Sequence, residues 1–425
     1  MISQALTTLE GWLARLEQLH PSSIELGLER VRRVWDRLGL EPDFPVIIVG
    51  GTNGKGSTCA FLEAILLAEG YKTGLYTSPH LLRYNERVRI AGRESGDAEL
   101  VRAFERVDAA RGDTSLTYFE FGTLGAMMQF IDAGIDVAIL EVGLGGRLDA
   151  VNIFDADAAI VTSVDLDHMD YLGDTREKIG FEKAGIFRAG CPAICADPTP
   201  PESLLEHADD ISADLRWVNG DFFFRRAADH WAYEGTGMSL PALPLPVMAG
   251  AYQLRNAAGA LAVLEALQAR LPVSEAAICK GLATVHLPGR FQRIARAPDV
   301  ILDVAHNPEA ARALAATLRA QPVRGRTVAV VGMLADKDAD NVLDALSGAI
   351  DAWWVCTPAS PRARDSTELA AILRRHAGSA PVWIEPDVIL ALEKARSTAH
   401  EGDRILVFGS FYTVAAVLHH AATKH

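Results

Sequence analysis

Short runs of branched apolar residues recur along the first half of the chain, and they limit the possible fold more than any other feature. These runs show no alternation of polar and apolar residues, which is typical of parallel strands buried on both faces. The stretches between them have helical spacing and stop before Gly70 and Gly134, as helices commonly do. We therefore predict an α/β domain with a mostly parallel sheet, with strands at 46–50, 73–78, 137–142 and 158–164 and helices at 59–69 and 119–133.

The second half of the chain starts a new series of strands and helices after an irregular stretch. PALPLP (241–246) cannot hold a helix and is expected to bend over the surface or to form a sheet edge. A helix is expected at 251–271, and the following residues 286–299 contain two prolines and a glycine. We place the domain boundary after residue 294, so that 1–294 form the first domain. Residues 295–425 are predicted to form a smaller, Rossmann-like α/β domain with strands at 299–305, 327–332, 352–356, 381–384 and 404–410.

Composition and charge narrow the class of protein. The 425 residues are enough for about two to three domains. With 55 acidic and 41 basic side chains, the formal net charge is −14, which argues against a broad nucleic-acid surface. The N-terminal residues lack the pattern of a signal peptide, and no apolar stretch is long enough to span a bilayer. The five cysteines lack a metal-binding spacing, so we expect reduced thiols in a cytoplasmic protein.

The stretch VIIVGGTNGKGSTC (46–59) has the order of a strand, a glycine-rich turn and a helix start. It differs from the common phosphate-binding loop, because Val49 stands at the position of the first glycine and Gly56 separates Lys55 from Ser57. Glycines let backbone N–H groups turn inward, and the N-terminus of the following helix favours an anion. The alternative is a tight turn with an incidental lysine. Taken alone, the loop indicates a nucleotide site of unspecified kind.

Polar residues also follow the predicted strand at 73–78. Ser78 and His80 would lie at the carboxyl edge of the sheet, where ligands bind in open α/β folds. Three basic side chains nearby are suited to carboxylates, namely Arg83, Arg87 and Arg89. The alternative is a capped turn followed by a solvated basic strand.

Glu141 ends a wholly apolar strand, where an unpaired carboxylate would be costly. A magnesium ion bridging phosphates would resolve that cost, and so would an ion pair with Arg147. After the next strand, a group of polar residues suits a divalent cation with one histidine ligand, although such clusters are often only acidic loops: Asp165, Asp167, His168 and Asp170.

Two further residues are ambiguous when read alone. Lys183 lies in a helical context, where a lysine is ordinarily a surface residue or an ion-pair partner. Asp303 repeats the pattern of Glu141 and could hold a ribose hydroxyl or cap a helix. For the helix that follows, Asn307 is the better N-cap, with Pro308 in the first turn.

Read together, these stretches are similar to the Mur-ligase superfamily, and more narrowly to the bacterial dihydrofolate synthase/folylpolyglutamate synthase family. The order of the motifs carries the resemblance, which runs from about residue 30 to Val417: GTNGKGST, TSPHL with YNERVRI, LEVGLGGRLDAVN, VTSVDLDHMDYLG with EKAGI, LPGRFQ, ILDVAHNP, GMLADKD and GSFYTVAAV. One departure is Val151, where the family usually has threonine, close to the expected pterin site.

The resemblance implies an ATP site and a metal site. The residues implied to contact ATP are Thr52, Asn53, Gly54, Lys55, Gly56, Ser57, Thr58, Asn256, Arg290, Asp303 and His306. The resemblance implies two magnesium sites, and the implied ligands are Ser78, Glu141, His168 and a carbamylated Lys183. An unmodified lysine would repel a cation, whereas its carbamate is anionic. Lys55, His168 and Lys183 are implied to be catalytic.

The resemblance also implies the substrates and the reaction. The segments that would enclose the pterin and benzoate groups are Ile24, Glu25 and Leu26, then Thr117, Tyr118, Phe119 and Glu120, and finally Leu148, Asp149 and Ala150. The implied enzyme is an ATP-dependent ligase that adds L-glutamate to 7,8-dihydropteroate and further glutamates to reduced folates through an acyl phosphate. The alternative is an enzyme with the polyglutamylating activity only.

Other classes of protein fit less well. A cell-wall peptide ligase would carry a nucleotide-sugar domain before the loop, where we count only 49 residues. A regulatory GTPase needs an Asn-Lys-x-Asp element, which does not occur in the chain. A non-enzymatic nucleotide-binding scaffold would have little use for carboxylates at two strand ends. We expect a monomer whose partners are small-molecule substrates, without nucleic acid or membrane.

Overall fold

The branched apolar runs of the first half become neighbouring strands of one sheet. The computed structural model describes residues 7–22 and 24–423. The chain forms two compact units, one of Met1–Val247 with Leu254–Val285 and one of Met248–Gln253 with His286–His425. The boundary that we expect after residue 294 remains a prediction.

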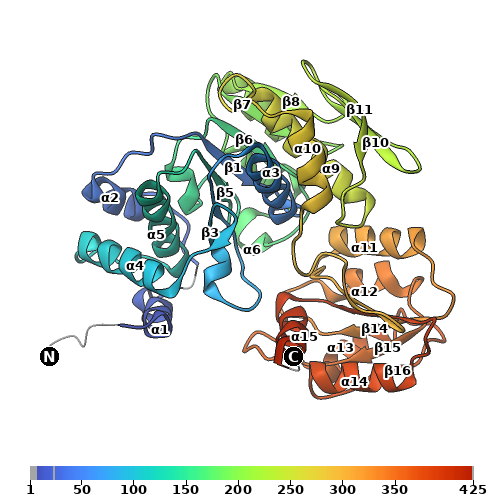
Figure 1. The fold of residues 1–425 in the computed structure, drawn as a ribbon. Helices are drawn as coiled ribbons and strands as arrows, with labels where there is room; N and C mark the ends of the chain where they lie inside the picture. The colour runs from blue at the N-terminus through green and yellow to red at the C-terminus, as the bar shows by residue number, and fades with distance from the viewer. Residues whose placement is uncertain (1–6, 23, 424–425) are drawn as a thin grey trace, which may run out of the picture. The chain divides into compact units, whose positions relative to one another are not determined.

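The first unit is built on an eight-stranded sheet of order β4-β3-β2-β5-β1-β6-β7-β8 (Figure 1). The six strands from β2 to β8 in this order are parallel, and β3 and β4 add an antiparallel edge. The predicted mostly parallel sheet is therefore confirmed. The strands are β1 (Val46–Gly50), β2 (Thr73–Tyr76), β3 (Val88–Ile90), β4 (Arg93–Glu94), β5 (Val137–Glu141), β6 (Ala158–Val161), β7 (Pro192–Cys195) and β8 (Asp214–Trp217).

Helices cover the first sheet because its central strands are buried along their whole length. Four helices contact one another in the blue-to-teal part of Figure 1, namely α1 (Leu9–Leu19), α2 (Glu29–Leu38), α4 (Asp97–Arg111) and α5 (Tyr118–Ala133). Helix α3 (Lys55–Glu69) packs on α10 (Glu275–Thr284). The remaining helices are α6 (Met169–Leu172), α7 (Arg176–Ala184), α8 (Glu202–Asp210) and α9 (Ala251–Ala266), with short 3-10 turns η1 (Tyr84–Arg87) and η2 (Ala150–Ile153).

Helix α3 starts four residues earlier than the sequence pattern predicts, at Lys55 instead of Cys59. Gly54 occupies the N-cap with a positive φ of 91°, a conformation that glycine adopts at little cost. The helix therefore begins inside the glycine-rich loop itself.

A small antiparallel sheet of order β11-β10-β9 follows the eight-stranded sheet in the chain. Its strands are β9 (Phe223–Arg226), β10 (His230–Glu234) and β11 (Ser239–Pro244). The first four residues of the proline-rich stretch (241–244) lie in β11, an edge strand, where proline's lack of an N–H group is tolerated. One of the two outcomes expected for PALPLP, a sheet edge, is thus confirmed.

The second unit contains a six-stranded sheet of order β12-β13-β17-β14-β15-β16, parallel except for β12. Asn307 caps α11 by accepting a hydrogen bond from the Ala310 N–H at 3.0 Å, and Pro308 is its first residue, as predicted. The strands are β12 (Gln292–Ala295), β13 (Asp299–Leu302), β14 (Thr327–Val331), β15 (Ala352–Val355), β16 (Val382–Ile384) and β17 (Arg404–Phe408), and the helices are α11 (Pro308–Ala320), α12 (Ala339–Ser347), α13 (Ser366–Leu373), α14 (Val388–Thr398) and α15 (Phe411–Thr423).

Helices α11, α12 and α13 share one apolar core with the second sheet, while α14 and α15 contact each other and strands of that sheet. This arrangement confirms the Rossmann-like α/β prediction for the second half. Among the helices formed by the described residues, none combines the length and apolarity needed to cross a membrane.

Candidate active site

The glycine-rich loop connects β1 to α3 in a conformation that two of its glycines make possible. Gly51 and Gly54 have φ angles of 138° and 91°. A Cβ at Gly51 would lie 2.0 Å from Thr162 Oγ1, and one at Gly54 would lie 2.5 Å from Asn256 Oδ1. The loop therefore needs glycine at both positions, and the predicted ATP residue Asn256 packs against it.

The N-terminus of α3 has the features that favour an anion. Gly54 at the N-cap has no side chain to occupy the N–H groups of the first turn, and the helix dipole places partial positive charge there. The Lys55 ammonium donates hydrogen bonds to the carbonyls of Gly51 at 3.0 Å and Thr52 at 3.2 Å. Backbone amides and one ammonium group are thus gathered at the same turn, which favours the phosphate-loop interpretation over an incidental lysine.

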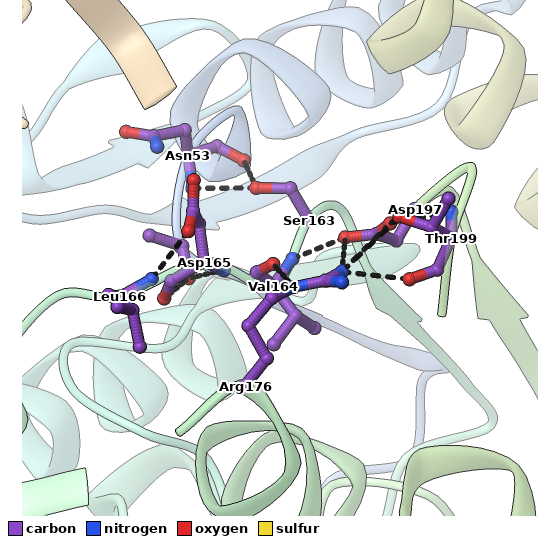
Figure 2. A network of polar contacts seen from close by, with 9 residues as sticks. Asn53, Ser163, Val164, Asp165, Leu166, Arg176, Asp197 and Thr199 are labelled. Atoms are coloured by element: carbon purple, nitrogen blue, oxygen red, sulfur yellow. Dashed lines mark hydrogen bonds and ion pairs between the residues drawn. The ribbon is translucent and has the colours of Figure 1, made fainter. Parts of the chain in front are cut away.

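The segment after β6 holds the loop through hydrogen bonds of main-chain and hydroxyl groups (Figure 2). The Thr52 N–H donates to the Ser163 carbonyl at 2.8 Å, and the Asn53 N–H donates to Ser163 Oγ at 3.0 Å. Thr52 Oγ1 accepts from the Asp165 N–H at 3.0 Å and donates to the Asp165 carbonyl at 3.1 Å. Thr162 Oγ1 donates to the Asn53 carbonyl at 2.7 Å. These bonds fix the part of the loop that precedes Lys55.

Glu141 lies at the carboxyl end of β5, directly across from Val49 of β1, and is only 5% exposed. Its carboxylate accepts a hydrogen bond from the Ser78 N–H at 3.1 Å, so two predicted metal ligands are neighbours. The alternative partner, Arg147, pairs with Glu182 at 2.8 Å.

Lys183 is 3% exposed on α7, so of the two roles that are ordinary for a lysine in this local context, that of a surface residue is excluded. Packing of α7 on the rest of the unit buries this position, which its sequence neighbours alone do not reveal. His168 is exposed, with a left-handed φ of 52° at the N-cap of α6.

The acidic segment after β6 does not assemble into a metal site of its own. Within 7–22 and 24–423, no three His, Cys, Asp or Glu side chains gather as a metal-binding group. Asp165 and Asp167 each accept a hydrogen bond from the next N–H, at 2.8 and 2.9 Å. The acidic-loop alternative is therefore favoured for the cluster. Of the predicted ligands Ser78, Glu141, His168 and Lys183, only Glu141 and His168 are residues of these four types. The absence of such a group therefore does not test this set, which remains a prediction.

The three segments predicted to enclose the acceptor, 24–26, 117–120 and 148–150, are called the first, second and third acceptor segments, and they contact one another in the first unit. Arg30 forms ion pairs with Glu25 and with Glu120, the latter at 3.1 Å, and so joins the first segment to the second. The Gly27 N–H donates to the Leu148 carbonyl at 3.3 Å and joins the first segment to the third. Segments that are distant in the chain are thus neighbours in the first unit, while their role in acceptor binding stays a prediction.

Glu120 also begins α5. It forms a capping box with Thr117, in which the Thr117 N–H donates to Glu120 Oε2 at 2.7 Å and the Glu120 N–H donates to Thr117 Oγ1 at 3.2 Å. The start of this helix and the position of the second acceptor segment therefore depend on the same two side chains.

Asp149 in the third segment is buried and accepts hydrogen bonds from the N–H groups of Leu144 at 2.8 Å and Val151 at 3.1 Å. Burial raises the pKa of Asp149 to about 7, while these hydrogen bonds and the charge of Lys55 act in the opposite direction. The electrostatic effect of Lys55 indicates that the nucleotide loop and the third acceptor segment are close.

Arg87 packs against two tyrosine rings, one of them in the second segment. The Arg87 guanidinium lies 5.4 Å from the ring centroids of both Tyr84 and Tyr118, and its Nε donates to His80 Nδ1 at 2.8 Å. Phe119 contacts Tyr76 with ring centroids 5.7 Å apart. Arg87 is therefore an integral part of this cluster, in contrast to a solvated strand residue.

The other two arginines of that stretch have different surroundings. Arg83 pairs with Glu94 at 2.6 Å on the surface, and Arg89 pairs with the buried Glu63 at 3.2 Å. The prediction that all three arginines add charge at one place is not supported by these contacts.

In the second unit, the predicted ATP residues lie near Phe411. The Arg290 guanidinium is 5.4 Å from the Phe411 ring centroid, and the His306 ring is 6.1 Å from it. Asp303 accepts hydrogen bonds from the N–H groups of Phe291 and Ala305, both at 2.9 Å. Burial raises the pKa of Asp303, and the nearby Arg290 opposes that shift.

Sequence reasoning missed several charged residues that support these segments. Arg30 lies where the resemblance begins but in none of the motifs given above, and Arg176 lies in none of them either. Asp197 follows the apolar strand β7, which is the same signal that identified Glu141 and Asp303. That signal would have found Asp197, whereas nothing local indicates Arg30 or Arg176.

Comparison with known proteins agrees with this fold. The model of the Mur ligase middle domain matches residues 49–195, and the model of the Mur ligase glutamate ligase domain matches residues 289–411. These matches define the class as that of the Mur ligases.

The similarity to particular proteins is closer still. The Escherichia coli dihydrofolate synthase/folylpolyglutamate synthase is 47% identical over 98% of this chain and 96% of its own length. The Haemophilus influenzae enzyme of the same name is 42% identical over 97% of each chain. The chain belongs to the dihydrofolate synthase/folylpolyglutamate synthase family, whose members are ATP-dependent ligases.

Solved structures agree. The structure of E. coli FolC in complex with DHPP and ADP has a TM-score of 0.93 at 45% identity and covers 99% of each chain. The Yersinia pestis bifunctional folylpolyglutamate synthase/dihydrofolate synthase complexed with AMPPNP and Mn ion has a TM-score of 0.92 at 47% identity and covers 100% of each chain.

Proposed function

We propose that this chain is a bifunctional ligase that joins L-glutamate to 7,8-dihydropteroate and adds further glutamates to reduced folates at the expense of ATP. The observation that carries the proposal is the match to enzymes of both activities over nearly the whole chain. The geometry supports it, because the phosphate loop, Glu141 and Ser78 follow adjacent parallel strands and therefore share the carboxyl edge of one sheet.

The proposed reaction begins with activation of the acceptor. A carboxylate is a poor electrophile, so its oxygen attacks the γ-phosphorus of ATP and the bond to the bridging oxygen of ADP breaks. The amine of glutamate then attacks the acyl carbon, phosphate leaves, and the amine loses a proton. Lys55 and the N-terminus of α3 would stabilise the negative charge on the phosphoryl oxygens during the first step.

A divalent metal is part of the proposal. The hydroxyl of Ser78 and the carboxylate of Glu141 are oxygen donors that suit a hard divalent cation, and the imidazole of His168 would add a nitrogen ligand. The structure of the relative from Y. pestis is a complex with AMPPNP and Mn ion. When bound, magnesium would neutralise phosphate charge during phosphoryl transfer. We further propose that Lys183 is carbamylated, because a carbamate supplies oxygen ligands whereas an ammonium repels the cation.

The acceptor would occupy the region bounded by the three acceptor segments. Tyr118 and Phe119 offer aromatic faces, and Asp149 offers a carboxyl group of raised pKa that can donate or accept a hydrogen bond. The E. coli relative in complex with DHPP supports an acceptor of this kind. A polyglutamylating enzyme that ignores dihydropteroate is the remaining alternative.

The nucleotide contacts from Asn256, Arg290, Asp303 and His306, the number of metal ions, the monomeric state and the cytoplasmic location also remain predictions.

A direct assay tests the proposed function. Purified protein with ATP and magnesium should release phosphate only when dihydropteroate and glutamate are both present, and mass spectrometry should show dihydrofolate. Replacing dihydropteroate by tetrahydrofolate should give the next glutamate adduct if both activities are present. Phosphate release that is indifferent to dihydropteroate and to every folate would overturn the folate assignment.

A further inference from the structure

The segment that is hydrogen-bonded to the nucleotide loop is in turn hydrogen-bonded to two charged side chains. Ser163 and Asp165 make the hydrogen bonds to Thr52 and Asn53, and the residue between them, Val164, is buried. The Val164 N–H donates to Asp197 Oδ2 at 2.7 Å. The Val164 carbonyl accepts from Arg176 Nε at 2.9 Å. Both polar groups of this residue are thus engaged by charged side chains (Figure 2).

The two charged residues also contact each other. Arg176 Nη2 lies 3.4 Å from Asp197 Oδ2 and donates to the Thr199 carbonyl at 2.8 Å. Asp197 is 4% exposed, and its second oxygen accepts from the Thr199 N–H at 2.8 Å. Hydrogen bonds to ionised groups are stronger and more directional than those between neutral groups. The carboxylate and the guanidinium together leave Val164 little freedom to move.

A displacement of Val164 would be transmitted to the loop. Its neighbours are one peptide away on each side, and they bind Thr52 and Asn53, which directly precede the anion-binding start of α3. Neither Arg176 nor Asp197 is hydrogen-bonded to the loop itself among the contacts that the structure describes. Their effect on a nucleotide is therefore indirect.

We propose that Arg176 and Asp197 form a positioning pair for the nucleotide site: they clamp Val164 and thereby set the geometry of the phosphate loop. This inference rests on the proposed function for the identity of the ligand, a nucleoside triphosphate. The pair acts on phosphate binding, and the acceptor site is held by different contacts, those of Arg30.

Substitutions of Asp197 separate its role as a hydrogen-bond acceptor for the Val164 N–H from the role of its negative charge. Asp197→Asn keeps an oxygen that can accept from the Val164 N–H but removes the charge, whereas Asp197→Ala removes both. Because an unsatisfied buried donor is costly, Asp197→Ala should weaken binding of AMPPNP with Mn²⁺ roughly tenfold, and Asp197→Asn should lie between it and the wild type. The Michaelis constant for dihydropteroate should change less than about twofold.

Arg176→Gln gives a second approach if Asp197→Ala does not fold, because the Arg176 side chain is 38% exposed and its removal disturbs less of the core. Asp174→Asn is the matched control: this carboxylate precedes the same helix and pairs with Lys178 at 2.8 Å, but both side chains are largely exposed. The control should bind the nucleotide like the wild type.

Calorimetric titration of the full chain with AMPPNP and Mn²⁺, together with thermal unfolding, tests whether Arg176 and Asp197 act as a positioning pair. Weaker nucleotide binding in Asp197→Ala and Arg176→Gln, with the Asp174→Asn control unchanged, supports the positioning pair. Lower thermal stability with unchanged nucleotide affinity would overturn it, since the pair would then be structural only. A wild type that binds AMPPNP but makes no dihydrofolate would overturn the proposed function and leave the positioning pair supported or refuted by the same titration.

Discussion

The nucleotide loop and the acceptor segments of the first unit are stabilised in different ways. The loop is held by hydrogen bonds from main-chain and hydroxyl groups of the segment after the neighbouring strand β6, together with glycines at strained positions. The first two acceptor segments are joined by side-chain ion pairs centred on Arg30, of which one partner, Glu25, is 45% exposed, and a single main-chain hydrogen bond joins the first to the third. The loop is therefore preorganised by its sheet, whereas the acceptor region depends on charged side chains.

This difference predicts different consequences of mutation. A preorganised loop acts on charge that develops during phosphoryl transfer, so its loss should lower turnover. Partly exposed ion pairs contribute modestly to stability and are screened by salt, so their loss should mainly alter acceptor affinity. The predictions that follow test this comparison from the largest expected effect to the smallest.

Lys55→Ala should give the largest effect. Removing the ammonium takes away the positive side chain nearest the start of α3, and turnover should fall at least about 10³-fold with the fold intact. Phosphate release and circular dichroism measure the two properties. Lys280→Ala on the exposed face of α10 is the control, and it should be as active as the wild type. A fully active Lys55→Ala would refute the role of the loop.

Loss of the carbamate on Lys183 should have the next largest effect. Protein freed of carbon dioxide at mildly acidic pH should lose activity by roughly 10- to 100-fold, because a metal ligand has become an ammonium, and bicarbonate should restore the activity. The measurement is the initial rate before and after bicarbonate. Lys183→Ala provides the control, since it should not respond. Indifference of the wild type to bicarbonate would count against carbamylation.

Arg30→Met should weaken acceptor binding without affecting ATP. The change leaves the buried carboxylate of Glu120 without its cation, so the Michaelis constant for dihydropteroate should rise roughly tenfold. Steady-state kinetics with each substrate varied in turn measures the effect. Arg33→Met on the exposed face of α2 is the matched control. An equal rise in the Michaelis constant for ATP would contradict the expectation that Arg30 affects the acceptor region and not the nucleotide loop.

Asp149→Asn should produce the smallest effect, a change in the pH dependence of stability. Burial raises the pKa of Asp149 to about 7 in the folded state, whereas the unfolded chain loses this proton near pH 4, at about the usual pKa of aspartate. Below about pH 4 both states are protonated and no penalty exists. Between about pH 4 and 7 the unfolded state binds fewer protons, so this residue lowers wild-type stability as the pH rises.

The asparagine variant lacks that titration. The stability of the wild type relative to Asp149→Asn should therefore decrease from pH 4 to 7 and stay level above pH 7. Urea unfolding of the nucleotide-free proteins at several pH values measures the difference. Parallel stability curves for the two proteins would show that Asp149 titrates normally in the folded state.

Features confined to one stretch of sequence were predictable. Apolar strands that end in a carboxylate revealed Glu141 and Asp303, and Asn307 with Pro308 revealed the start of α11. The start of α3 was placed too late, because a glycine N-cap carries none of the usual side-chain signals. The burial of Lys183 does not follow from its local sequence, because a nine-residue helix of mixed polarity does not show which side another element will cover.

By itself the sequence determined the order of strands and helices, the glycine-rich loop and the family to which the chain belongs. These follow from apolar periodicity and from residue types at short spacing, which act locally. Only the tertiary structure decided which charges meet: Arg30 lies 90 positions from Glu120, and Arg176 lies 21 positions from Asp197. Coulombic attraction and hydrogen bonding depend on distance in space, and only folding brings these groups together.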